Sequence, residues 1–175
     1  MNYKPNTNQA CFGVALTNLL LYLKDETTAC EVWNNYESHS LVRPKGDIHP
    51  AFATRLVKDL TQEKYDAILY MNWEADPKNE IRHSFIDSLK VSNPDCLVEI
   101  IAEEEKSRSI RGFSKDMIQY MTPSILFLKR TDKELHAIAY LGNDRYIENG
   151  VIKSTEQISR IGLKEPCALV EIRKK

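Results

Sequence analysis

The chain has 175 residues, of which 24 are Lys or Arg and 25 are Asp or Glu, so its formal net charge is −1. This length suits a single domain, and a hydrophobic fraction of 42% is enough for a sizeable core. The balanced charge argues against nucleic acid or an anionic membrane as the main partner. No apolar stretch approaches the roughly 20 residues that a membrane span needs.

The N-terminal segment and the cysteines bear on compartment and cofactors. The segment MNYKPNTNQ is polar and does not resemble a secretory signal, so we expect a cytoplasmic protein, with delivery as a secreted effector left open. The cysteines contain no CxxC pair, and no histidine stands at metal-ligand spacing beside them. We therefore expect reduced thiols, no metal and no cofactor. Cys30, Cys96 and Cys167 lie within helix or strand patterns and are expected in the core.

The first predicted element is a helix that carries a cysteine in its first turn. Apolar residues recur at intervals of three and four over residues 12–24. Thr7 and Asn8 are candidate N-caps for this helix. Cys11 then falls in the first turn.

The remaining elements follow in chain order. Helices are expected at 27–37 and from 49 to about 62, a strand from 65 (YDAILYMNW), a helix at 79–89, and a strand or short helix from 96 (CLVEIIAE). The last third predicts a helix at 113–120, strands at 124–130, 136–142, 145–149 and 167–173, and a short helix at 154–162. Ser154 and Gln157 have the spacing of a capping box. The order predicts one α+β domain, helical over about 1–62 and sheet-forming over about 113–175, with N-terminal helices on a mostly antiparallel sheet and the middle region unassigned.

Cys11 has the position that an activated nucleophile requires. A free thiol ionises near pH 8.5, and the unpaired N–H groups at a helix start favour the thiolate. The same N–H groups can bind the oxyanion that forms when a carbonyl is attacked. A nearby amide can add a donor, and Gln9 is the first candidate, with Asn8 and Asn6 behind it.

A base for this thiol is expected at the start of a strand. In the segment HAIAYLG, His136 faces the same side as Ile138, and the next strand returns after the turn Gly-Asn-Asp. A regular hairpin, in which Leu141 lies opposite the tyrosine of the next strand, brings Asn149 diagonal to His136. The other register selects Glu148 instead. Both side chains can orient the imidazole ring, and Asn149 is preferred, although Asn149-Gly is also typical of a turn.

The two segments NQACFGVALTNLLLYL and ELHAIAYLGNDRYIENG resemble the papain-like cysteine peptidase superfamily, nearest in style to the bacteriocin-processing bacterial thiol peptidases. In that family a Gln precedes a Cys that starts the central helix, a His opens a strand, and an Asp or Asn closes the next strand. The Gln commonly stands further upstream than Gln9 does here. The resemblance implies a papain-like fold and a Cys11-His136-Asn149 triad with Gln9 near the oxyanion.

The sequence therefore predicts a cysteine peptidase that acts on a peptide or protein substrate and needs no cofactor. Two alternatives stay open. An acyl or amide transferase, or a deamidase, would use the same thioester intermediate with another acceptor. A catalytically inactive module would keep the cleft and bind a peptide or protein.

Overall fold

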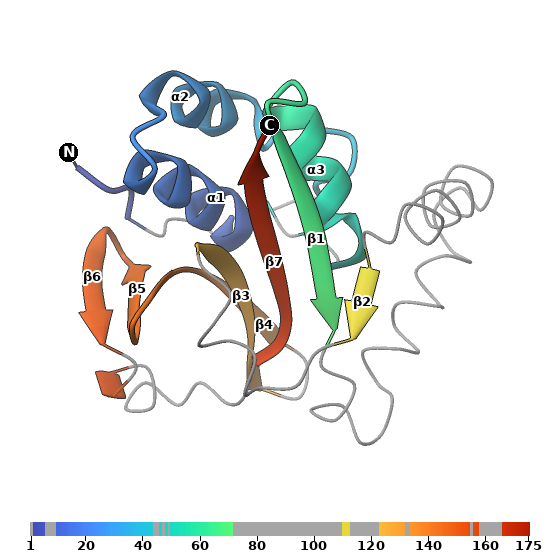
Figure 1. Cartoon of the computed structure of the whole chain (residues 1–175). Coiled ribbons are helices and arrows are strands. Elements are labelled where there is room, and N and C mark those ends of the chain that lie inside the picture. The colour runs from blue at the N-terminus through green and yellow to red at the C-terminus, as the bar shows by residue number, and fades with distance from the viewer. Residues whose placement is uncertain are drawn as a thin grey trace.

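The computed structural model describes residues 2–5, 10–43, 46, 48, 50–71, 110–112, 123–131, 134–154, 156–157 and 166–175. Helices α1 to α3 lie along one side of a curved sheet, with β2 at one edge and β6 at the other (Figure 1). The predicted helices at 79–89 and 113–120, and the element from 96, lie outside the described residues. The α+β class and the helices packed on a mostly antiparallel sheet are confirmed.

The helices follow the apolar periodicity of the sequence. They are α1 (Cys11–Tyr22), α2 (Glu26–Asn35) and α3 (Ala53–Leu60), the last preceded by the 3-10 turn η2 (Pro50–Phe52). Asp25 is the N-cap of α2, and its carboxylate accepts a hydrogen bond from the N–H of Thr28 at 3.2 Å. None of the described helices combines the length and apolar character that crossing a membrane requires.

The sheet has the strand order β2-β1-β7-β3-β4-β5-β6. The strands are β1 (Tyr65–Met71), β2 (Ile110–Gly112), β3 (Ser124–Thr131), β4 (Glu134–Gly142), β5 (Arg145–Glu148), β6 (Val151–Ser154) and β7 (Pro166–Lys174). Every neighbouring pair is antiparallel except β1 and β2, which are parallel. The sequence did not predict β2 or β6. The capping box is partly confirmed, because the N–H of Ser154 donates to Gln157 Oε1 at 3.0 Å.

Strand β4 shows how the alternation of side chains divides the core. Ala137 and Ala139 join the large cluster formed with the three helices, and their small side chains let α1 pack closely. Ile138 and Tyr140 belong to a second cluster on the opposite face. Both faces of β4 are buried, so this central strand carries apolar residues at nearly every position.

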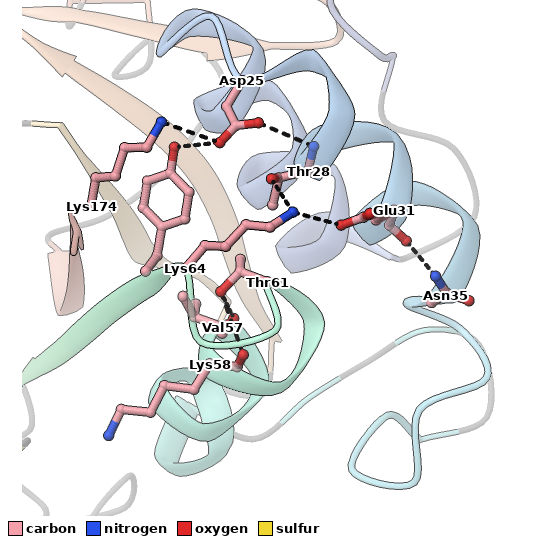
Figure 2. A network of polar contacts seen from close by, with 10 residues as sticks. Asp25, Thr28, Glu31, Asn35, Val57, Lys58, Thr61, Lys64 and Lys174 are labelled. Carbon is pink, nitrogen blue, oxygen red and sulfur yellow. Dashed lines mark hydrogen bonds and ion pairs between the residues drawn. The ribbon is translucent and has the colours of Figure 1, made fainter.

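A polar network ties α2 to the sheet (Figure 2). The Asp25 carboxylate accepts a hydrogen bond from the Tyr65 hydroxyl at 3.0 Å, and Lys64 Nζ lies 3.3 Å from Thr28 Oγ1. Burial alone would raise the pKa of Asp25, but the hydrogen bonds from Thr28 and Tyr65 and the charge of Lys174 lower it below 3.8. Asp25 therefore stays ionised while it caps α2 and anchors the helix to β1.

Candidate active site

Cys11 is the first residue of α1, and the helix start is not neutralised by its own side chains. The N-cap, Ala10, makes no side-chain hydrogen bond, and the first turn contains no acidic residue. The positive end of the helix dipole therefore favours an anion at this position. The Cys11 side chain is half-buried against the helix-side core, and its sulfur forms no disulfide. The helix begins at the cysteine itself, and the predicted caps Thr7 and Asn8 lie outside the described residues.

Contacts from α2 and from Gly46 fix the start of α1. The buried Tyr36 donates a hydrogen bond from its hydroxyl to the carbonyl of Gly46 at 2.9 Å. Gly46 has a positive φ of 78° and lies so close to Ala10 that an added Cβ would stand 2.7 Å from the Ala10 Cβ. The ring of Tyr36 covers Gly13, where an added Cβ would be only 2.5 Å away. The position of Cys11 is therefore set by close packing on both sides of it along the chain.

His136 lies near the beginning of β4 beside a buried carboxylate. Its Nε2 is 3.5 Å from Oε1 of Glu148. The other carboxylate oxygen of Glu148 accepts a hydrogen bond from Lys153 Nζ at 2.8 Å. Imidazole, carboxylate and ammonium thus follow one another across β4, β5 and β6. His136 pairs with Leu128, which belongs with Ile138 to the cluster on the face of the sheet away from the helices, whereas Cys11 packs against the helix-side cluster. The His136–Glu148 pair therefore lies on the opposite face of the sheet from Cys11.

The β4–β5 hairpin does not have the regular register that the sequence predicted. Gly142 pairs with Arg145 across the turn, but the next pair is Tyr140 with Tyr146. Leu141 is therefore an extra residue on β4, and a β-bulge shifts the ladder by one position. In the predicted register Leu141 would have been opposite Tyr146, so that prediction was wrong.

This shift decides which residue accompanies the histidine. A one-residue slip moves every side chain of a strand to the other face. With the bulge, Glu148 falls opposite Ile138 and on the face of His136, as the alternative register required. Asn149 is exposed and has a φ of 50°, and with Gly150 at 77° it forms the turn between β5 and β6. Asn149 thus takes the turn role that its Asn-Gly pair also indicated, rather than the position beside His136.

The first turn of α1 lies over the strands that carry the histidine. The ring of Phe12 stacks on that of Phe127, with centroids 5.6 Å apart and an interplanar angle of 11°. Phe127 on β3 pairs with Ala137 on β4, and Ala137 directly follows His136. Phe12 therefore packs on the helix side of β3 and β4, near the end of β4 where His136 is found, whereas His136 itself faces the other side of the sheet.

The same face of α1 is directed toward the β5–β6 hairpin. Asn18 stands two turns after Cys11 on that helix face. Its Oδ1 accepts from the N–H of Lys4 at 2.6 Å, and its Nδ2 donates to the Lys4 carbonyl at 2.9 Å. The backbone of residues 3–5 also lies against Gly150, where an added Cβ would be 3.0 Å from the nearest carbonyl oxygen. The N-terminal segment therefore joins the Cys11 face of α1 to the turn that follows Glu148.

Other predicted residues stand as follows. Gln9, Asn8 and Asn6 lie outside the described residues, so the side-chain donor to an oxyanion stays a prediction. Cys30 is exposed on α2, so its expected place in the core was wrong. Cys96 lies outside the described residues, as does the side chain of Cys167. Within the described ranges, no three His, Cys, Asp or Glu side chains are grouped so that they could hold a metal ion.

Lys153 was not among the site residues predicted from the sequence. The signal was available: in a hairpin that turns at Asn149-Gly150, Lys153 lies diagonal to Glu148 on the same face. It was overlooked because the segment after Gly150 was not recognised as a strand.

No protein-family model matches the chain, and comparisons with curated proteins and with solved structures found no similar protein. Any assignment of function therefore depends on the residues and geometry of the chain itself.

Proposed function

We propose that this chain is a cysteine peptidase of papain-like type, with Cys11 as nucleophile, His136 as base and Glu148 as the group that orients and stabilises the imidazole. Two observations support the proposal: Cys11 stands at the start of α1 with no acidic residue in the first turn, and the His136–Glu148 pair at 3.5 Å lies at the end of β4 that this turn covers, on the other face of the sheet. The proposed reaction therefore requires the His136 ring to turn past the end of β4 toward Cys11. A carboxylate beside one ring nitrogen fixes the tautomer and stabilises the imidazolium.

The proposed reaction is acyl transfer through a thioester. The thiolate of Cys11 attacks the carbonyl carbon of a peptide bond, and the oxyanion accepts hydrogen bonds from N–H groups at the start of α1. His136, protonated when the thiolate forms, gives its proton to the leaving amine as the C–N bond breaks. His136 then takes a proton from water, which attacks the thioester, and the thiolate returns with release of the acid. The substrate is a peptide or protein, and no step requires a cofactor.

The test is a digestion of a complex peptide library by the purified chain, read by mass spectrometry. Wild type, Cys11→Ala and His136→Ala are compared at equal concentration. We expect new peptide ends only with the wild type, because thiol catalysis requires both groups. New ends that persist in the Cys11→Ala variant would overturn the proposal.

The same measurement separates the alternatives, because hydrolysis, deamidation and conjugation to an amine leave products of different mass. Deamidated Gln side chains without new peptide ends would identify a deamidase. Cross-linked or amine-modified products would identify a transferase. The absence of any Cys11-dependent product, together with binding of library peptides, would favour the inactive module.

A further inference from the structure

Two pockets lie between α1 and α2, and they share one residue, Trp33. The pocket nearer the helix start, here called the Glu37 pocket, has a volume of about 250 Å³. Its lining consists of Ala10, Gly13, Val14, Trp33, Tyr36 and Glu37. Since Ala10 directly precedes Cys11, the Glu37 pocket borders the turn that carries the proposed nucleophile.

The lining has the chemistry of a cation site. Trp33 and Tyr36 supply aromatic side chains, and Glu37 supplies the only charge among the lining residues. Glu37 is exposed and makes no ion pair with any residue that the structure describes. An aromatic wall with a carboxylate beside it favours an ammonium or guanidinium group.

Trp33 already contacts a cation elsewhere. Lys4 Nζ lies 5.0 Å from the centroid of the Trp33 ring. Lys4 lines the second pocket, of about 330 Å³, which also contains Glu26 and Cys30. The contact between Lys4 and Trp33 is a cation–π contact. A basic side chain in the Glu37 pocket could make the same kind of contact with the Trp33 ring.

The size and position of the Glu37 pocket define its ligand further. Small-molecule sites usually measure about 300–1,000 Å³, so a pocket of about 250 Å³ suits one long side chain rather than a whole ligand. The Glu37 pocket lies on the α2 side of the start of α1, beside the residue that precedes Cys11. A peptide whose carbonyl group is held at Cys11 would place one side chain toward α2.

We infer that the Glu37 pocket is a specificity subsite for a Lys or Arg side chain next to the peptide bond that Cys11 attacks. This inference rests on the proposed peptidase function, because that function defines which peptide bond lies beside the subsite. The recognition of a basic side chain can be measured without catalysis.

The experiment uses two thiol-directed peptidyl acyloxymethyl ketones that differ only at the residue beside the ketone, which is arginine in one and its neutral isostere citrulline in the other. The rate of Cys11 modification is followed by mass spectrometry. We expect the arginine probe to react about five- to tenfold faster with the wild type. Glu37→Gln should abolish the preference, so that the arginine probe reacts no faster than the citrulline probe. Equal rates for both probes with the wild type, or a preference that survives in Glu37→Gln, would overturn the inference.

Glu26→Gln is the matched control, because Glu26 is an exposed carboxylate of the same helix that lines the other pocket. Glu26→Gln should leave the preference for the arginine probe intact. If it reduces that preference as much as Glu37→Gln does, the preference reflects long-range attraction of arginine to the negative charge of α2 rather than a subsite.

A binding measurement keeps the inference separate from the proposed function. N-acetyl-arginine amide and its citrulline analogue are titrated against the Cys11→Ala variant, with and without Glu37→Gln, and followed by NMR. Arginine-selective binding that Glu37→Gln abolishes would support the subsite even if the wild type cleaves nothing. Equal binding of both compounds would overturn the subsite even if the peptidase proposal holds.

Discussion

Glu148→Gln removes the negative charge beside His136 and nearly preserves the shape of the side chain. In the proposed mechanism the thiolate of Cys11 forms by transfer of its proton to His136, so anything that stabilises the imidazolium lets the thiolate form at lower pH. The substitution should therefore raise the pH at which Cys11 becomes reactive. Peptide-level mass spectrometry of iodoacetamide-treated protein reads this reactivity and resolves Cys11 from the exposed Cys30.

The magnitude follows from the geometry. Unit charges 3.5 Å apart attract by about 4–5 kcal/mol at an effective dielectric constant of about 20. Lys153, at 2.8 Å from the other carboxylate oxygen, opposes a large part of this attraction, and the 15% exposure of the His136 side chain screens the rest. A net stabilisation of about 1–2 kcal/mol corresponds to a shift of about one pH unit.

The expected result is a midpoint of Cys11 alkylation about one unit higher in Glu148→Gln than in the wild type, with about tenfold slower alkylation below the midpoint and nearly equal rates well above it. Asn149→Ala is the matched control and should leave the midpoint unchanged. Lys153→Gln should move the midpoint in the opposite direction, because it removes the competing cation. If Glu148→Gln is folded by circular dichroism and titrates like the wild type, the proposed coupling between Glu148, His136 and Cys11 is refuted.

Three further predictions concern stability. Gly13→Ala should destabilise the protein by about 1–3 kcal/mol in urea unfolding, because the new methyl group would stand 2.5 Å from the buried Tyr36 ring, and an unchanged unfolding midpoint would contradict this packing. Gly150→Ala should cost about 1–2 kcal/mol because its φ of 77° disfavours a Cβ, and a neutral effect would argue against the turn geometry. Burial, with the hydrogen bond to Asp25 and its charge, raises the pKa of Tyr65 to about 12, whereas an unfolded tyrosine ionises near pH 10. The unfolded state therefore loses its proton first, stability falls as the pH rises from about 10 to 12, and Tyr65→Phe should lessen that fall; an identical decline in both proteins would count against the assignment.

The elements that the sequence predicted correctly are those whose own residues specify them. The helix that begins at Cys11 is mostly apolar and is buried on every side from Phe12 to Leu20, and β4 alternates small residues with large ones. Both patterns lie in the residues of the element itself, because they reflect how that element is buried. The same reasoning placed Cys11 at a helix start and His136 near the start of a strand.

The elements that were missed depend on partners elsewhere in the chain. Strand β2 consists of Ile110–Gly112 alone and pairs in parallel with β1, which lies far away in sequence. Strand β6 is mostly exposed and lacks an alternating apolar face. The Asn149-Gly150 turn was therefore the only sequence pattern that indicated this strand. The bulge at Leu141 was not predicted either, because whether a hairpin takes an extra residue is decided by packing on both faces of β4.

The bulge also explains why an exposed edge strand matters to the proposed site. A carboxylate as buried as that of Glu148 is expensive to desolvate, and a neutral imidazole 3.5 Å away does little to offset this. Lys153 on β6 supplies a counter-charge at 2.8 Å from the carboxylate. When Cys11 gives its proton to His136, the positive charge that appears on the ring meets a carboxylate already in place, and the negative sulfur meets the helix dipole. In the proposed mechanism β6 therefore holds the cation that allows a glutamate to stand where an asparagine was expected.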